Sequence, residues 1–341
     1  MAKRIFFVTY HKVLLATELK AYVDLGFEVV FPFFYNDVPD QSAKKNNIDE
    51  WLKINTRHST LSDENLLKIS KFNFFSNKKL SRKMSRLLNT YFDYVIVCQN
   101  PSWNLPFLLD FKKNIFYRMY GDINTFTAFA KNNPEYKNLI ISKQNFKFLP
   151  FSNLIIEHEE NWVKQRCDVV PYWIEDDVYK LRNKWSPNYD LNEIGMLCPN
   201  ISNIFYKKQF LYLKKYFEER YYKYFGVQID KIVDFNIVGS LTREELLKKF
   251  TNLTGFLYHY RIENSLYLPP VEAMIIGVPV IFFPNSLLHR MLGNKNLPSL
   301  AINEEDAKIK INLLRNKDQK FISEVKRSQE EIIKIYDKKN N

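Results

Sequence analysis

The start of the chain places an apolar run, a helical pattern and a second apolar run one after another. Residues 4–9 are apolar and aromatic, which is typical of a buried strand. Residues 13–25 carry apolar side chains close to helical spacing, Gly26 follows them, and residues 27–31 are apolar again. Two strands joined by a helix pair in parallel, because the helix returns the chain to the same end of the sheet. The opening therefore predicts an α/β fold with an open parallel sheet.

Similar patterns continue along the chain and form two series. Further strands of the first series are expected at 94–98, 114–118 and 153–156. In the second series, strands are expected at 192–199, 233–239, 255–260 and 278–283, and helices at 209–225, 242–250 and 269–276. We therefore expect two α/β domains, residues 1–170 and 171–315, and a C-terminal helix within 316–341. The apolar stripe of that helix predicts that it docks on the body of the protein, with the N-terminal domain as one candidate surface.

Composition excludes two common nucleotide-binding motifs. The 341 residues include only eight glycines, and neither G-x-G-x-x-G nor G-x-x-x-x-G-K-[ST] occurs. Cys98, Cys167 and Cys198 lie far apart without a C-x-x-C pair, so we expect neither a disulfide framework nor a cysteine zinc site. No Asp-x-Asp pair is present to hold a metal ion. We expect no metal and no bound cofactor.

The chain is basic and has no segment typical of membrane insertion. It has 50 Lys and Arg against 38 Asp and Glu, a net charge of +12, which favours an anionic partner. We find no signal peptide pattern and no apolar stretch of about 18 residues, so a cytoplasmic protein is expected. Residues 77–88 combine basic side chains with Leu80, Met84, Leu87 and Leu88 at helical spacing. This helix either lies on an anionic membrane as a peripheral contact or buries its apolar face in the core.

The stretch 235–283 carries the residues most suited to chemistry. Three polar residues follow one of its expected strands: Arg261, Glu263 and Asn264. A helix then begins at Pro269, and in open α/β sheets ligands bind where strand ends and helix N-termini meet. A helix N-terminus with an arginine nearby suits phosphate, and Glu272 in the first turn suits the paired hydroxyls of a ribose. These residues predict a nucleoside diphosphate site without a P-loop.

The same stretch resembles the donor-binding motif of GT-B glycosyltransferases, particularly the retaining group that includes glycogen- and sucrose-type synthases and many bacterial surface-glycan enzymes. That motif has a Glu, seven residues, a second Glu followed by Ala-Met, and then Gly-x-Pro-Val. Glu272-Ala273-Met274 and Gly277-Val278-Pro279-Val280 match it. Asn264 stands where the family has its first Glu, and Glu263 immediately precedes it.

The resemblance implies a fold, a reaction and a set of site residues. The fold would be two Rossmann-like domains facing across a cleft, with the acceptor on the N-terminal domain and a nucleotide diphosphate sugar on the C-terminal domain. The reaction would be metal-independent sugar transfer to a saccharide or lipid-linked saccharide, in capsule, lipopolysaccharide or other surface-glycan synthesis. Glu272 would bind the ribose, and Glu263 or Asn264 would lie near the donor sugar. The other candidate donor-binding residues are Arg261, Lys207, Lys208, Gly239, Ser240, Pro270 and Val271.

Two residues at expected strand ends of the N-terminal half are candidates for a general base. His11 follows the first strand, and Asp122 follows the strand at 114–118. Either could accept the acceptor's proton if the reaction inverts configuration. A retaining reaction of the family's usual kind requires no protein base. His259 lies in an apolar strand and is expected to be a core residue rather than a ligand.

Two other functions are compatible with parts of this pattern. A nucleotide-sugar epimerase can be built on the same two-domain scaffold. The charge of +12, with 21 Tyr and 28 Phe, is also compatible with a nucleic-acid-binding protein. We disfavour that alternative, because the aromatic residues lie mostly in strand-like apolar runs and no known nucleic-acid-binding motif is present. No nucleic-acid partner is therefore expected.

Overall fold

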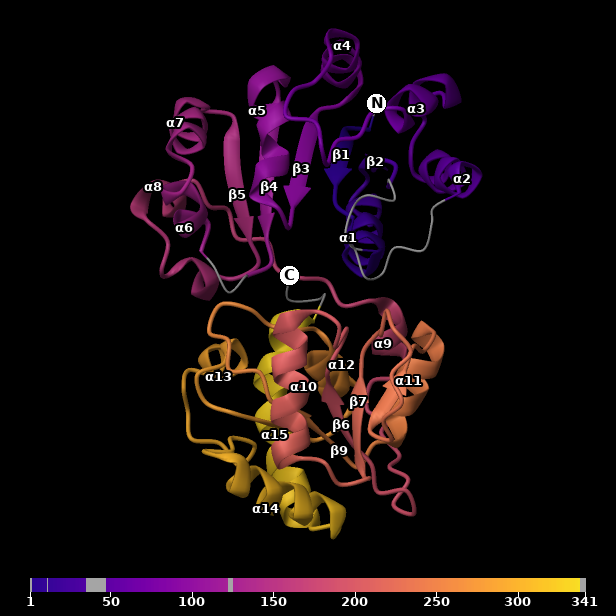
Figure 1. The fold of residues 1–341 in the computed structure, drawn as a ribbon, viewed down its shortest axis with the longest axis vertical. Helices are drawn as coiled ribbons and strands as arrows, with labels where there is room; N and C mark the ends of the chain where they lie inside the picture. Colours follow the sequence, from indigo (N-terminus) through magenta and orange to yellow (C-terminus); the bar gives the residue numbers. More distant parts are fainter. Residues whose placement is uncertain (1, 11, 35–46, 122–124, 338–341) are drawn as a thin grey trace. The chain divides into compact units, whose positions relative to one another are not determined.

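In the computed structural model the chain divides into two units, residues 1–173 and 174–341 (Figure 1). The structure describes residues 2–10, 12–34, 47–121 and 125–337. Each unit contains a five-stranded parallel sheet. This is the α/β class that the strand–helix–strand opening predicts.

The sheet of unit 1 has the strand order β2-β1-β3-β4-β5. Its strands are β1 (Arg4–Val8), β2 (Glu28–Val30), β3 (Tyr94–Cys98), β4 (Asn114–Met119) and β5 (Phe146–Pro150). The helices around it are α1 (Lys12–Asp24), α2 (Ile48–His58), α3 (Asp63–Ser70), α4 (Arg82–Tyr91), α5 (Leu105–Asp110), α6 (Phe126–Lys131), α7 (Pro134–Ser142) and α8 (Asn161–Lys164). The central strands are almost wholly buried, as continuous apolar runs in a parallel sheet require.

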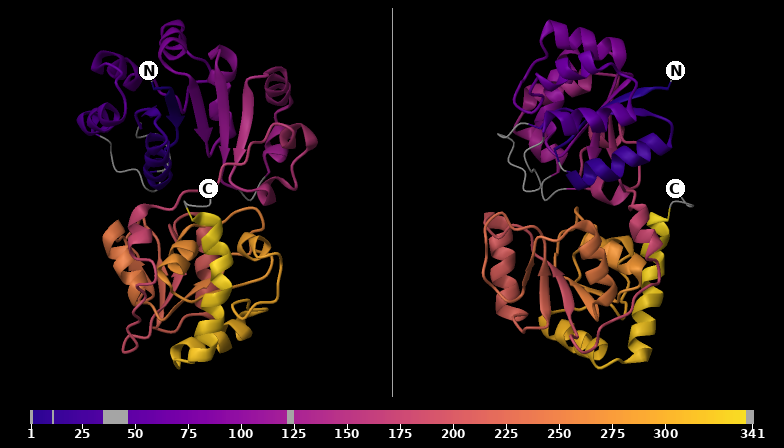
Figure 2. Two further views of the ribbon diagram at one scale, coloured as in Figure 1. Left: turned by 180° about the vertical axis from the view of Figure 1, so that it is seen from behind. Right: turned by 90° about the vertical axis from the view of Figure 1, so that its right-hand side faces the viewer.

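The sheet of unit 2 has the order β10-β9-β6-β7-β8. Its strands are β6 (Ile194–Leu197), β7 (Tyr222–Phe225), β8 (Ile237–Gly239), β9 (Gly255–Tyr258) and β10 (Val280–Phe282). The helices are α9 (Asp176–Lys180), α10 (Ile204–Tyr216), α11 (Arg243–Asn252), α12 (Pro269–Ile276), α13 (Leu287–Met291), α14 (Glu304–Arg315) and α15 (Gln319–Tyr336). Helix α10 lies on one side of this sheet and α15 on the other (Figure 2).

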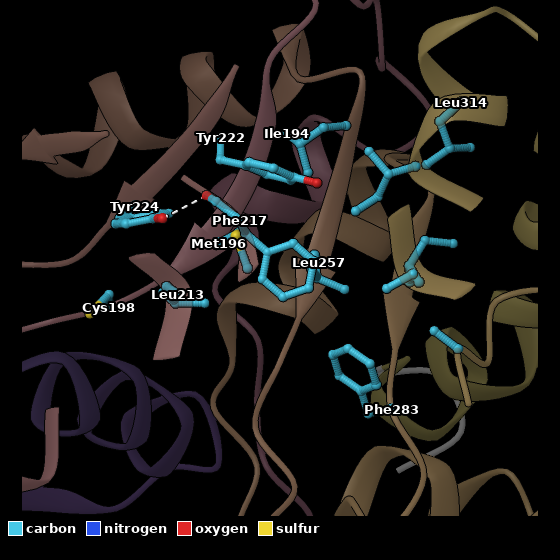
Figure 3. Close-up of a cluster of buried hydrophobic side chains, with 14 of the residues drawn as sticks. Ile194, Met196, Cys198, Leu213, Phe217, Tyr222, Tyr224, Leu257, Phe283 and Leu314 are labelled. Atoms are coloured by element: carbon cyan, nitrogen blue, oxygen red, sulfur yellow. Dashed lines mark hydrogen bonds between the residues drawn. The ribbon is translucent and has the colours of Figure 1, made fainter. Parts of the chain in front are cut away.

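The core of unit 2 is built from both strands and helices. Ile194, Met196 and Tyr222 from the strands are fully buried against Leu213 of α10 and Leu314 of α14 (Figure 3). One polar group inside this core has a backbone partner: the Tyr224 hydroxyl donates to the carbonyl of Phe217 over 2.7 Å. Unit 2 therefore has its own hydrophobic core.

Two expected elements are wrong, and local chemistry explains both. Residues 153–156, where a strand was expected, form a short 3-10 helix capped by the Ser152 hydroxyl. The last strand of unit 1 is instead β5, which lies just before it and in which exposed Lys147 alternates with buried Phe146 and Phe148. The helix expected at 209–225 ends at Tyr216, and its last residues are strand β7. The alternation of buried Tyr222 and Tyr224 is the period of a strand rather than a helix.

The C-terminal helix and the basic helix of unit 1 both bury their apolar faces. Helix α15 belongs to unit 2 and packs against α12, α14 and β10. In α4, Met84, Leu87 and Leu88 are buried, so the stripe that suggested a membrane contact is part of the core of unit 1. Of the helices within the described ranges, none combines the length and the apolar character needed to cross a membrane.

Candidate functional site

The strand order of unit 2 reverses direction at the middle of its sheet. From β6 the chain proceeds to β7 and β8 on one side, and then returns to β9 and β10 on the other. The loops that follow β6 and β9 therefore leave the same edge in opposite directions. In doubly wound sheets this reversal is where ligands bind.

The loops after β6 and β7 are fixed to one another. A Cβ added at Gly226 would lie 2.6 Å from Cα of Pro199, and Gly226 has φ +138°, so only glycine fits there. The Asn200 amide donates to the Val227 carbonyl over 2.9 Å, and the Gln228 side chain donates to the Cys198 carbonyl over 2.8 Å. These contacts fix the two loops relative to each other.

Gly239 is the last residue of β8, at the same edge of the sheet, and Ser240 follows it. Gly239 has φ +83°, and a Cβ added to it would meet nothing within 4 Å. Ser240 is exposed. The backbone at Gly239 therefore faces open space, which leaves room for close approach of a ligand. The following helix, α11, begins with a capping box between Thr242 and Glu245.

Glu272 is a buried carboxylate in the first turn of α12. Glu272 is only 5% exposed, and its neighbours Pro270 and Val271 are buried as well. Because Pro269 and Pro270 have no backbone N–H, the first turn of this helix offers fewer amide donors than most helices. A buried charge needs a partner, and here the partner is Arg243.

Arg243, the first residue of α11, joins three carboxylates. Its two terminal nitrogens donate to the two oxygens of Glu272, from Nη1 to Oε2 over 3.1 Å and from Nη2 to Oε1 over 2.9 Å. Its Nε donates to Glu175 over 3.1 Å and to Asp177 over 3.2 Å. Burial alone lowers the pKa of Arg243, but Glu272, Glu175 and Asp177 outweigh it and raise that pKa above its ordinary value. Sequence patterns gave no sign of this contact, because Arg243 and Glu272 lie on different helices.

Arg290 of α13 holds the loop that follows β9. Its Nη1 donates to the Glu263 carbonyl over 2.7 Å and to the Asn264 side-chain oxygen over 3.2 Å. The Leu287 amide also donates to the Ile262 carbonyl over 2.8 Å. The Glu263 residue is exposed, whereas Asn264 is half-buried. The structure therefore fixes the position of this loop and leaves the Glu263 carboxylate in solvent.

The remaining cationic candidates lie toward α10 and α14. Arg261 pairs with Glu304 over 3.1 Å, and its guanidinium lies 4.2 Å from the centre of the Phe283 ring. Lys207 and Lys208 are exposed on α10. Arg261 is thus held on the α14 side, while the two lysines are accessible to a ligand from solvent.

His259 is a core residue, as the sequence predicted. It is 3% exposed, and its ring lies 6.1 Å from that of Tyr212 and 4.2 Å from that of Tyr260. Burial, with a smaller effect of Arg261, lowers the pKa of His259 to about 3. The imidazole is therefore neutral at pH 7. The two candidate bases, His11 and Asp122, fall outside the described residues.

The three cysteines of the chain are free thiols. Cys98 and Cys198 are buried free thiols, and Cys167 is partly buried. Within the described parts of the chain, no three His, Cys, Asp or Glu side chains gather in a way that could hold a metal ion. The candidate site is therefore defined by Glu272, Arg243 and the loops around them.

Known proteins resemble this chain in structure but not in sequence. No family model and no curated protein matches it. A glycosyltransferase from Rickettsia africae aligns over 98% of this chain and 94% of its own, with a TM-score of 0.64 and 12% identity. Anabaena HepE, solved with UDP and glucose, aligns over 96% and 94%, with a TM-score of 0.57 and 12% identity. Sucrose-phosphate synthase from Thermosynechococcus elongatus aligns over 98% and 95%, with a TM-score of 0.56 and 10% identity.

The chain has the GT-B fold. Its two units are the two Rossmann-like domains that the sequence resemblance implied. Within that fold, most of the matched motif packs in the core: Ala273 and Met274 are buried, and Gly277 ends α12 with φ +103°. Packing does not explain Glu272, which is a buried charge. It is therefore the motif residue that most needs a functional explanation.

Proposed function

We propose that the protein is a glycosyltransferase that takes a sugar from a nucleotide diphosphate sugar, with the donor bound at the carboxyl edge of unit 2. The observation that carries the proposal is the buried carboxylate of Glu272 beside the strand reversal of a GT-B fold. The HepE structure, which contains UDP and glucose, supports a nucleotide sugar as the donor. In this proposal the oxygens of Glu272 accept hydrogen bonds from the ribose hydroxyls.

Side chains supply most of the charge that meets the diphosphate. The prolines at the start of α12 remove amide donors, although the helix dipole still favours an anion there. Lys207 and Lys208 are exposed and able to reach an anion, and they stabilise charge on the departing diphosphate without a metal ion. Arg261 donates to Glu304 through Nη2 alone, so its other N–H groups can contribute to an anion.

Asn264 and Glu263 lie near the transferred sugar in this proposal. Because Arg290 donates to the side-chain oxygen of Asn264, that amide is oriented by α13. Its nitrogen then donates to a sugar hydroxyl, while Glu263 accepts from one. An inverting reaction would use His11 or Asp122 as its base, and a retaining reaction would need neither.

The acceptor that we propose is a saccharide or a lipid-linked saccharide in surface-glycan synthesis, with the protein in the cytoplasm. This assignment depends on the motif resemblance alone. The burial of the apolar face of α4 removes the main reason to expect that helix on a membrane. We therefore propose the saccharide acceptor without assigning a membrane contact to α4.

The proposal is tested by melting the full chain with UDP, GDP, ADP, CDP and TDP and with their sugar conjugates. A ligand that binds only the native state raises the melting temperature. One nucleotide should do so in the unaltered protein, and Glu272→Gln should reduce the shift. Glu305→Gln is a matched control, because Glu305 is an exposed acid in the first turn of another helix. Equal shifts in both variants would refute the donor site.

A further inference from the structure

Both oxygens of Glu272 are already bonded in the ligand-free protein. Arg243 places one terminal nitrogen on each oxygen, at 3.1 and 2.9 Å. Such a fork uses the two lone pairs that face forward from a carboxylate. A vicinal diol presents two O–H donors side by side and needs the same two lone pairs. Arg243 and a ribose therefore cannot both use these two forward lone pairs of Glu272.

Arg243 has a second anchor that does not involve Glu272. Its Nε donates to Glu175 and Asp177, which lie at the start of α9. Three carboxylates surround this one guanidinium, so it keeps two anionic partners when it leaves Glu272. The Arg243 side chain is 33% exposed, which leaves it room to turn toward α9. The structure thus shows Arg243 bonded to Glu272, and it also supplies the partners, Glu175 and Asp177, that Arg243 keeps after it leaves Glu272.

We propose that Arg243 occupies the diol-binding oxygens of Glu272 until a nucleotide arrives, and that the ribose displaces its two terminal nitrogens. The inference rests on the proposed function and deepens it. A nucleotide with both ribose hydroxyls replaces the two hydrogen bonds that Arg243 gives up. A nucleotide lacking both hydroxyls leaves Arg243 in place and gains nothing from Glu272. Arg243 therefore reduces the preference for ribose below what Glu272 alone would give.

The occupied state also has a physical reason. Without Arg243, the empty site would hold an unpaired carboxylate that is nearly inaccessible to solvent, which is costly. The guanidinium neutralises Glu272 while no donor is bound. An approaching diphosphate is repelled by the carboxylates of Glu272, Glu175 and Asp177. The positive charge of Arg243 offsets this repulsion.

The experiment compares two affinities for each variant by calorimetry. UDP, GDP, ADP and CDP are each titrated beside the corresponding 2′,3′-dideoxy analogue into the full chain. Both members of a pair carry the same diphosphate, so the lost charge of Arg243→Gln cancels in their ratio. We expect this ratio, the ribose preference, to rise about tenfold in Arg243→Gln, because one net hydrogen bond to a charged group corresponds to about that factor.

A second variant keeps the test sound if Arg243→Gln does not fold. Glu175→Gln combined with Asp177→Asn removes the charges of the second anchor and leaves the fork on Glu272 intact. Arg243 should then hold Glu272 more tightly, so the ribose preference should fall.

Three results would overturn the inference. A ribose preference that falls in Arg243→Gln would show that Arg243 orients Glu272 for the ribose instead. A preference that is unchanged in both variants would show that the two groups do not compete. Failure of every nucleotide to bind the unaltered chain would overturn this inference and the proposed function together.

Discussion

The guanidinium of Arg118 lies 2.9 Å from the carboxylate of Glu18, and neither side chain is more than 1% exposed. Arg118 also donates to the carbonyls of Leu149, Val170 and Pro171. The pair therefore ties α1 and β4 to the segment that ends unit 1. Every N–H group of Arg118 donates a hydrogen bond. Replacing Arg118 therefore tests how much this pair stabilises unit 1.

Removing both partners of this pair should cost less than the two single removals added together. Arg118→Met leaves the buried Glu18 carboxylate with the Tyr22 hydroxyl as a donor but without its cation, and removes the bonds of Arg118 to three carbonyls. We expect a loss of about 3–5 kcal/mol in the free energy of unfolding. The double variant Arg118→Met with Glu18→Met should lose less than the sum of the two single variants. Urea unfolding measures all four proteins, and strictly additive losses would contradict this account.

Gly226 and Gly239 both have positive φ but should tolerate alanine differently. At Gly226 the new Cβ would lie 2.6 Å from Pro199, so we expect Gly226→Ala to cost about 3 kcal/mol from overlap and strain. At Gly239 nothing lies within 4 Å, and only backbone strain of about 1 kcal/mol remains. Urea unfolding of the two variants gives the comparison. Equal losses would mean that the loops after β6 and β7 are not fixed as described.

The buried His259 should make stability depend on pH. Its folded pKa of about 3 lies below the ordinary value of 6.5, so the unfolded chain binds more protons between these values. The stability contribution is complete above pH 6.5 and is lost as the pH falls toward 3. Between pH 7.5 and pH 5 the loss should be about 2 kcal/mol.

The matched variant for this effect is His259→Phe, which keeps a ring between Tyr212 and Tyr260 and cannot be protonated. Between pH 7.5 and pH 5, the unaltered chain should lose about 2 kcal/mol more free energy of unfolding than His259→Phe does. Urea unfolding at both pH values measures the difference. The same pH dependence in both proteins would mean that His259 is accessible to protons in the fold.

The periodicity of the sequence was enough to predict the class of both units and several elements in detail. Helix α12 was expected at 269–276 and is Pro269–Ile276, because the prolines mark its start and Gly277 its end. The strand–helix–strand opening likewise appears as β1, α1 and β2. In both cases the determining residues are neighbours in the chain, so their effect is visible in one short stretch.

The sequence was less informative wherever distant residues decide the structure. Tyr222 and Tyr224 looked like a continuation of α10 until their pairing with β6 showed a strand. The fork between Arg243 and Glu272 joins two helices that are separated by a strand and a loop. No local pattern records such a contact, so Glu272 could be selected from its motif while its partner could not.

The most direct measurement of the proposed function is calorimetric titration of the full chain and of Glu272→Gln with the nucleoside diphosphate that raises the melting temperature. We predict saturable binding to the unaltered chain and about tenfold weaker binding to Glu272→Gln, the loss expected from one net charge-assisted hydrogen bond. Circular dichroism should show that the variant stays folded. Equal affinity in the two folded proteins would contradict the account.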